Sequence, residues 1–69
     1  MKDTEQELRR RLGGALREAR LAKELKQDQL AEMLDTDPET ISRFERGVAL
    51  PSLVRLLQLA EALGVTIVK

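Results

Sequence analysis

Three charged side chains, spaced four and three residues apart, carry most of the chemistry that this sequence offers. On a helix that turns about 100° per residue, Glu39, Arg43 and Arg46 fall within about 60° of one another, on the side opposite Ile41 and Phe44. An arginine on such a face can donate two hydrogen bonds to guanine O6 and N7, and a glutamate can accept one from cytosine N4. The alternative is a solvated ion pair between Glu39 and Arg43, which would be worth only about 0.3 kcal/mol.

Two short helices with a tight turn between them are the elements that must position this face. Apolar residues recur at helical spacing over residues 27–34 and again over residues 38–46. Between the two stretches, Asp37 can serve as an N-cap, and Pro38 suits the first position of the second helix. Two helices this short must cross closely to bury a core, and the small side chain of Ala31 allows it. This arrangement predicts a helix-turn-helix, whose second helix enters the major groove of DNA.

Four motifs follow one another along the chain in the order of a known family. They are Gln27-x-x-Leu30-Ala31, Thr40-Ile41-Ser42-Arg43-Phe44-Glu45-Arg46-Gly47, Pro51-Ser52-Leu53 and Ala62-Leu63-Gly64-Val65. Over roughly residues 12–66 the chain resembles the DNA-binding domain of the Cro and phage-repressor family. The resemblance implies an all-α, compact four- or five-helix domain of the lambda-repressor type, with a central helix-turn-helix at about residues 26–46. Asp35 departs from the family pattern, which usually has glycine at this turn position, although aspartate tolerates the left-handed conformation better than most residues.

A first helix is expected to precede the motif. Thr4 and Glu7 have the spacing of a capping box, so the helix should begin near residue 4. Its apolar stripe consists of Leu8, Leu12, Leu16 and Ala19. The Gly13-Gly14 pair interrupts this stripe, and we interpret it as a close helix contact or a weak point, with a functional hinge as the alternative. We expect residues 1–11 to form an N-terminal extension of this helix and residues 12–69 to form the domain.

A last helix is expected over about residues 53–63, with Ser52 as its N-cap and Gly64 as its C-cap. The side chains predicted to face the core are those of Leu53, Leu56, Leu57, Ala60 and Leu63. The remaining tail, residues 65–69, is apolar and β-branched, and is therefore more strand-like than helical. The resembled family usually continues into a fifth helix at this point.

The predicted DNA contacts fall into two groups. The expected base contacts are Pro38, Glu39, Ser42 and Arg43. The expected phosphate contacts are Lys26, Gln27, Thr40 and Arg46. Pro38 can offer only apolar contact, for instance with a thymine methyl group. Gln27 opens the first helix of the motif, where free backbone N–H groups can also hold a phosphate, and the family resemblance implies the same role. Plain helix capping is the alternative for Gln27 and Arg46. The resemblance further implies a structural ion pair between Arg20 and Glu45.

Composition narrows the possible functions. The 69 residues make one domain with a small core, and the absence of cysteine leaves no disulfide framework or thiolate metal site. Without histidine there is no near-neutral general base and no imidazole ligand. We see no nucleophile–base pair, metal cluster or phosphate-binding glycine loop, so we expect neither an enzyme nor a cofactor. No run of 18 apolar residues and no signal-peptide core occurs, so we expect a soluble, cytoplasmic protein.

Charge is divided unevenly along the chain although it sums to zero. Residues 9–26 carry seven basic and two acidic side chains, a net charge of +5, whereas residues 28–39 carry five acidic side chains and no basic one, a net charge of −5. A segment that faces phosphates would not normally be acidic. Either these acidic side chains point away from DNA, or non-specific affinity is weak and binding depends on specific contacts and dimerisation.

The chain also has more apolar residues than its core should need. The predicted dimer or partner surface consists of Val48, Leu50, Val54, Ile67 and Val68, and we expect Leu59 to be surplus as well. We therefore predict a homodimeric regulator that binds a specific double-stranded DNA operator, most simply a repressor. One alternative is the antitoxin of a toxin–antitoxin pair, which would use the apolar surface to bind a toxin protein. Another is an interaction module without DNA binding. For the tail, folding back over its own core is the alternative to dimer formation.

Overall fold

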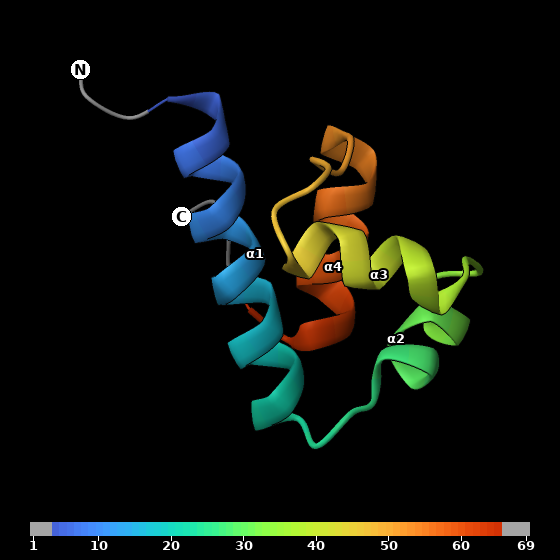
Figure 1. Ribbon diagram of the computed structural model, residues 1–69. Helices are drawn as coiled ribbons and strands as arrows, with labels where there is room; N and C mark the ends of the chain where they lie inside the picture. The colour runs from blue at the N-terminus through green and yellow to red at the C-terminus, as the bar shows by residue number, and fades with distance from the viewer. Residues whose placement is uncertain (1–3, 66–69) are drawn as a thin grey trace.

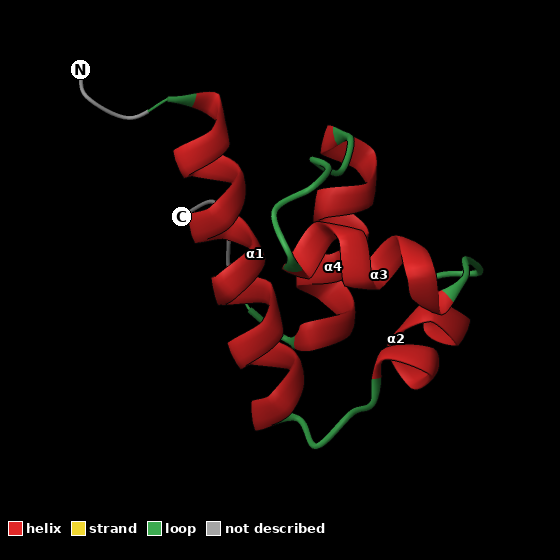
Figure 2. Ribbon diagram, in the orientation of Figure 1, coloured by secondary structure: helices red, strands yellow, loops and turns green. Residues whose placement is uncertain are grey.

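The computed structural model describes residues 4–65 (Figures 1 and 2). These residues form four α-helices and the loops that connect them. In chain order they are α1 (Glu5–Ala22), α2 (Gln27–Met33), α3 (Pro38–Glu45) and α4 (Leu53–Leu63). The all-α class and the positions of the helix-turn-helix elements are confirmed, with α2 and α3 each ending one residue before the predicted end. The tail predicted to be more strand-like than helical was residues 65–69. Residues 66–69 of it lie outside the described residues. None of the described helices is long and apolar enough to cross a membrane.

Local hydrogen bonds fix where the helices begin. The side chains of Thr4, Asp37 and Ser52 each accept a hydrogen bond from the backbone N–H three residues later, at 3.1, 2.8 and 3.1 Å. They satisfy N–H groups that a helix N-terminus would otherwise leave unpaired. At the other end of α4, Gly64 adopts the left-handed conformation, with φ of 70°. Asp35 is also left-handed, with φ of 56°. The turn between α2 and α3 therefore has an aspartate in a conformation that usually favours glycine.

The recognition helix candidate, α3, lies in the middle of the fold, against α1 on one side and α2 on the other (Figure 1). The largest side chains that are almost completely buried are those of Leu30, Ile41 and Leu59, from α2, α3 and α4. Leu16 of α1 and Phe44 of α3 complete the middle of this core. One face of α3 is therefore fixed by the core, which determines which of its side chains remain exposed.

The two adjacent glycines of α1 have different surroundings. A Cβ atom on Gly13 would lie 2.4 Å from the Phe44 carbonyl oxygen and 2.5 Å from that of Glu45, so only glycine allows α1 to approach the end of α3 this closely. This confirms the interpretation of a close helix contact for Gly13. A Cβ atom on Gly14 would meet no atom within 4 Å. Packing therefore does not explain Gly14, although glycine in a helix costs about 1 kcal/mol relative to alanine.

The predicted core stripe of α4 was wrong at two positions. Leu53 and Leu57 are 71% and 49% exposed, whereas Leu59, expected to be surplus, is only 1% exposed. The buried face of α4 is centred on Leu59, Ala60 and Leu63. Because leucine occupies five of the eleven positions of α4, several faces of this helix are almost equally apolar. The apolar stripe predicted for α1 was also wrong at its first residue, because Leu8 is 47% exposed.

Candidate nucleic-acid interface

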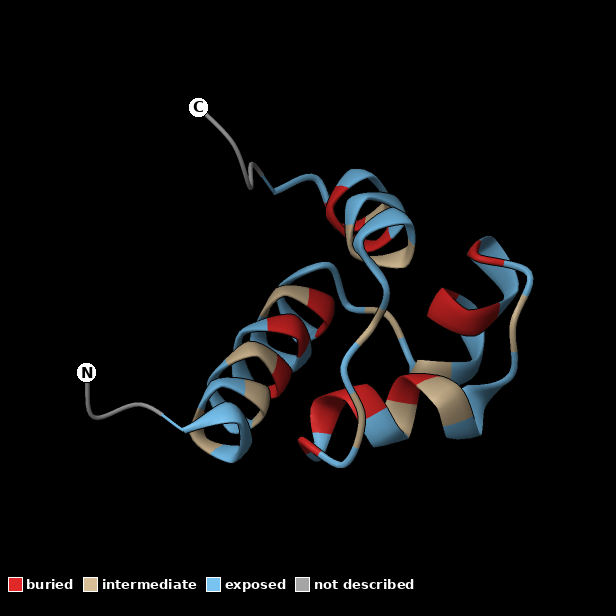
Figure 3. Cartoon of the chain, turned by 90° about the horizontal axis from the view of Figure 1, so that it is seen from above, coloured by how far each residue is buried: buried red, intermediate tan, exposed pale blue. Residues whose placement is uncertain are grey.

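The exposed face of α3 carries the predicted base-reading side chains. Pro38, Glu39 and Arg43 are exposed and Ser42 is half-buried, while the core holds the opposite face of the helix. In Figure 3, where burial is coloured, the side of this helix that is turned away from the other helices is largely exposed. The structure therefore brings the four residues predicted to contact bases onto one accessible face.

Arg46, at the end of α3, is held by two side chains of the same face. Its Nη2 atom lies 3.0 Å from Oε2 of Glu39, and its Nε donates to the Ser42 hydroxyl oxygen at 2.9 Å. The alternative predicted from the sequence, an ion pair between Glu39 and Arg43, is not the one formed. The observed partners are seven residues apart, two turns along the helix. Because both side chains are more than half exposed, the ion pair is worth at most about 1 kcal/mol and a phosphate can replace it.

Arg43 is left available by this arrangement. Within residues 4–65, its guanidinium takes part in no hydrogen bond or ion pair. Its charge does act on Asp37, the N-cap of α3. Hydrogen bonds from Thr40, through its side chain and its backbone N–H, hold the pKa of Asp37 below its usual range, and the positive charge of Arg43 adds a smaller effect in the same direction. The aspartate therefore stays ionised at neutral pH. Thr40, predicted to contact a phosphate, is here hydrogen-bonded to this cap.

A buried ion pair fixes the angle at which α3 is presented. Arg20 of α1 donates from Nε to Oε2 of Glu45 at 2.6 Å and from Nη2 to Oε1 at 3.0 Å. The two residues are only 6% and 9% exposed. The hydrogen bond to Glu45 is the main reason why the pKa of Arg20 is raised. Arg20 also donates from Nη1 to the carbonyl oxygen of Leu25, at 2.7 Å, which holds the loop that leads into α2.

The amide of Gln27 joins the same network. Its Nε2 donates to Oε1 of Glu45 at 3.0 Å, so the N-terminus of α2 is tied to the end of α3. The sequence indicated Gln27 only as a phosphate contact or cap, since no local pattern relates residues 18 positions apart. Lys26, the other predicted phosphate contact here, is exposed immediately before α2. A second unpredicted tie is Arg55, whose Nη1 donates to the Leu34 carbonyl oxygen at 2.7 Å and anchors the end of α2 to α4.

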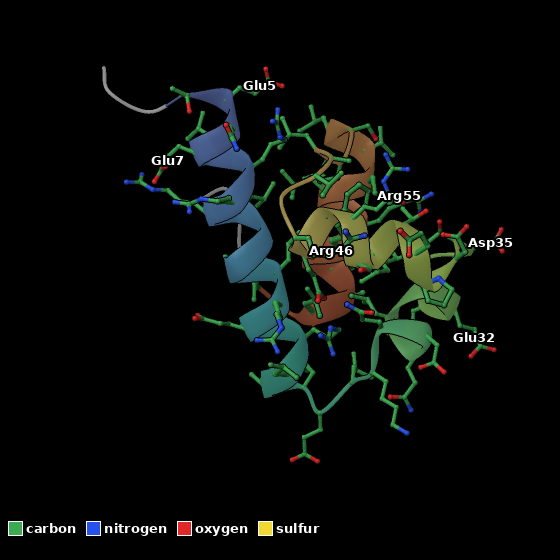
Figure 4. The ribbon with its side chains drawn as sticks, in the orientation of Figure 1. Glu5, Glu7, Glu32, Asp35, Arg46 and Arg55 are labelled. Carbon is green, nitrogen blue, oxygen red and sulfur yellow. The ribbon has the colours of Figure 1, made fainter. Side chains whose placement is uncertain are left out.

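The acidic segment lies at the other end of α3 from Arg46. Asp28, Glu32 and Asp35 line one open hollow beside Pro38. In Figure 4 the labelled Glu32 and Asp35 lie at the turn between α2 and α3, on the far side of the molecule from α1, whereas Arg46 is next to α1. These three acidic side chains are thus separated from Arg46 along the axis of α3.

Apolar side chains are exposed after α3, where a partner surface was predicted. Val48, Leu50 and Val54 are 53%, 45% and 65% exposed. Leu53 and Leu57, which the sequence assigned to the core, add to this exposed set. Ile67 and Val68, the other two residues predicted for the surface, lie outside the described residues.

Comparisons with known proteins agree with this geometry. Residues 16–69 match the family described as helix-turn-helix. A curated relative, multiprotein-bridging factor 1a of Arabidopsis thaliana, is 40% identical over 50 residues, which are 72% of this chain and 35% of that protein. The chain thus spans about a third of the length of this relative.

Two solved structures of bacterial regulators have a similar fold. The restriction-modification controller protein C.AhdI from Aeromonas hydrophila is 40% identical, with a TM-score of 0.80 and a coverage of 84% of both chains. The clp gene regulator ClgR from Corynebacterium glutamicum is 37% identical, with a TM-score of 0.82, over 86% of this chain and 63% of that chain.

Proposed function

The chain belongs to the helix-turn-helix family of DNA-binding domains, which is not enzymatic, and from that premise we propose that it is a sequence-specific transcriptional regulator, most simply a repressor. In this proposal α3 enters the major groove of double-stranded DNA. Two of the similar proteins are themselves named for control of genes or of restriction-modification.

One observation carries the proposal furthest: Arg43 projects from the exposed face of α3 with no hydrogen bond or ion pair inside residues 4–65. A guanidinium without an internal partner can be transferred to guanine O6 and N7 without first breaking a contact of the folded protein. The buried Arg20–Glu45 pair supports this role because it fixes the helix that carries Arg43. Glu39 and Ser42 provide an acceptor and a hydroxyl on the same face, and Pro38 an apolar surface.

Phosphate contacts are proposed near the C-terminal end of α3, where Gln27 of α2 is hydrogen-bonded to Glu45. Lys26 and Gln27 stand at the N-terminus of α2, and Arg46 at the end of α3. Contacts of this kind set the position of the helix on the duplex and carry no sequence information. To bind a phosphate, Arg46 must leave Glu39 or contact both groups at once. The exposure of both side chains allows this.

We propose further that the regulator binds as a homodimer through the exposed apolar residues after α3. One helix reads only about four base pairs, so regulators of this size gain useful specificity by pairing on two half-sites about 34 Å apart. Val48, Leu50 and Val54 lie after the reading helix, which supports a two-fold contact that leaves both reading faces accessible.

Selection of bound sequences from a random pool of double-stranded DNA tests the proposal. We expect enrichment of an inverted repeat whose half-site centres are about 10 base pairs, one helical turn, or a multiple of this apart. A pool that shows no enriched sequence after several rounds at moderate salt would contradict sequence-specific binding.

A further inference from the structure

A basic hollow lies where α1 crosses the end of α3. It has a volume of about 370 Å³ and is lined by Arg10, Arg11, Gly14, Glu45 and Arg46. Three arginines, two from α1 and one directly after α3, therefore line one open concavity. Gly47, which follows Arg46, adjoins the same stretch of α1, because a Cβ atom on Gly47 would lie 3.1 Å from the Cα of Arg10.

Gly14 leaves this hollow unfilled. A Cβ atom at this position would touch no other atom within 4 Å, so the glycine serves no contact within the described fold. Glycine is unfavourable inside a helix, and one of its ordinary uses is to let a ligand approach the backbone closely. Gly13 already accounts for the close approach of α1 to α3. The second glycine is better explained by an occupant of the hollow than by packing.

The carboxylates that contact the arginines of the hollow can be replaced by another anion. Glu39 lies 3.0 Å from Nη2 of Arg46, and both side chains are more than half exposed. The carboxylate of Glu45 is engaged by Arg20 and Gln27 in the core. Glu7 contacts both α1 arginines that line the hollow, with its oxygens 3.2 Å from Nη2 of Arg10 and 3.8 Å from Nε of Arg11. The side chains of Glu7, Arg10 and Arg11 are 38%, 64% and 63% exposed, so these pairs are weak and another anion can replace Glu7.

We propose that this hollow binds a phosphate of the DNA backbone, next to the bases that α3 reads. The proposal rests on the DNA-binding function proposed above and adds α1 to the surface that contacts DNA. Arg46 makes the two regions continuous, because it lines the hollow and also contacts Glu39 and Ser42 of the reading face. This continuity favours a DNA phosphate over an anion from any other source. Arg10 and Arg11 then extend the row of backbone contacts beyond the helix-turn-helix.

The alternative role for these arginines is confined to the fold. They could neutralise the carbonyl groups at the end of α3, as Arg9 does for the loop when its Nε donates to the carbonyl oxygen of Gly47 at 3.1 Å. In that case removing a guanidinium would lower the stability of the protein and leave the number of phosphate contacts unchanged. The two roles therefore predict different results from the same variants.

The test is the salt dependence of binding to a DNA sequence selected with the parent protein. Arg10→Gln keeps much of the aliphatic stem, and Lys23→Gln, at the far end of α1 beside Gly64, makes the same change in net charge. We expect Arg10→Gln to reduce the magnitude of the slope of log K against log salt by about one per protomer. Lys23→Gln should leave the slope at the parent value.

A second pair of variants removes a negative charge instead of a positive one. Glu7→Gln removes a carboxylate that contacts Arg10 and Arg11, whereas Glu18→Gln makes the same charge change at another position of α1. We expect Glu7→Gln to bind more tightly than Glu18→Gln at low salt.

Equal slopes for Arg10→Gln and Lys23→Gln, with the parent still binding its selected sequence, would overturn the phosphate site and leave the proposed function standing. A fall in thermal stability of Arg10→Gln with an unchanged slope would overturn it in favour of the role within the fold. A parent that binds no DNA would overturn the proposed function itself.

Discussion

The contacts of Arg20 and Glu45 determine how α3 is held, and both residues are almost completely buried. A buried ion pair contributes little when compared with well-packed apolar residues, but the loss of one partner leaves an uncompensated charge in the core. Two hydrogen bonds join Arg20 of α1 to Glu45 of α3, one joins Arg20 to the loop before α2, and one joins Glu45 to the first residue of α2. The hydrogen bond from Arg20 to Glu45 raises the pKa of Arg20, so the pair is a cation and an anion held together in the core.

Glu45→Ala should therefore destabilise the fold by about 3–5 kcal/mol, far more than the loss of a surface pair. The double variant Arg20→Met with Glu45→Leu should recover much of this loss, since apolar side chains of similar volume leave no buried charge unpaired. Urea unfolding of the parent, both single variants and the double variant gives the coupling energy. If the losses of the single variants simply add in the double variant, the two side chains do not interact.

At the scale of the helices, the contact between α1 and α3 depends on the absence of one Cβ atom. Gly13 brings α1 against the last carbonyl groups of α3, and the atoms that a side chain would strike belong to the backbone and cannot rotate away. Gly14, one residue later, faces open space. A substitution at Gly14 is therefore a control for the same substitution at Gly13.

Gly13→Ala should lower the free energy of unfolding by about 2 kcal/mol, because overpacking against fixed backbone atoms costs about 3 kcal/mol and the gain in helix propensity returns only about 1 kcal/mol. Gly14→Ala should instead raise it, by up to about 1 kcal/mol. Thermal or urea unfolding of both variants distinguishes the two sites. Equal effects at the two positions would show that α1 does not approach α3 as described.

The helix boundaries could be predicted from the sequence because their causes are local. Thr4, Asp37 and Ser52 cap the residues that follow them, and Gly64 ends α4 through its own backbone conformation. Helical periodicity also predicted which face of α3 is exposed, and the family resemblance implied the Arg20–Glu45 pair. The rotation of α4 could not be predicted in this way, since its many leucines leave several faces equally apolar. Ties between distant residues, such as Gln27 to Glu45 and Arg55 to the Leu34 carbonyl, have no local signal at all.

At the scale of the whole molecule, charge and apolar surface are segregated. The basic hollow and Arg46 lie at the α1 end of α3, and the acidic side chains of Asp28, Glu32 and Asp35 lie at the other end. With a formal net charge of zero, the protein has little general attraction for DNA. In the proposed mode of binding, specific contacts and pairing supply most of the affinity, and the exposed apolar residues after α3 provide the surface proposed for pairing.

The proposed dimer can be tested at Val54, which is 65% exposed in the first turn of α4. An aspartate is compatible with a helix N-terminus, so Val54→Asp should leave the fold intact while placing a charge in the apolar surface. Sedimentation equilibrium at tens of micromolar should show a dimeric parent and a largely monomeric Val54→Asp. Met33→Asp, at an apolar residue of α2 that is 55% exposed, is the control and should remain dimeric. A parent that is monomeric both free and on DNA would exclude the homodimer, and the surface would then fit a different protein, such as a toxin.

The most direct test of the central claim compares Arg43→Ala with the parent on the selected DNA sequence and on every single-base variant of it. We expect the loss of preference at one base pair in each half-site, corresponding to about 1–3 kcal/mol, with the preferences elsewhere and the stability of the fold unchanged. This result would identify Arg43 as the side chain that reads that base pair. If Arg43→Ala retained the parent's affinity and its full pattern of base preferences, Arg43 would not be a base-reading residue, and the proposal that α3 recognises DNA through it would be wrong.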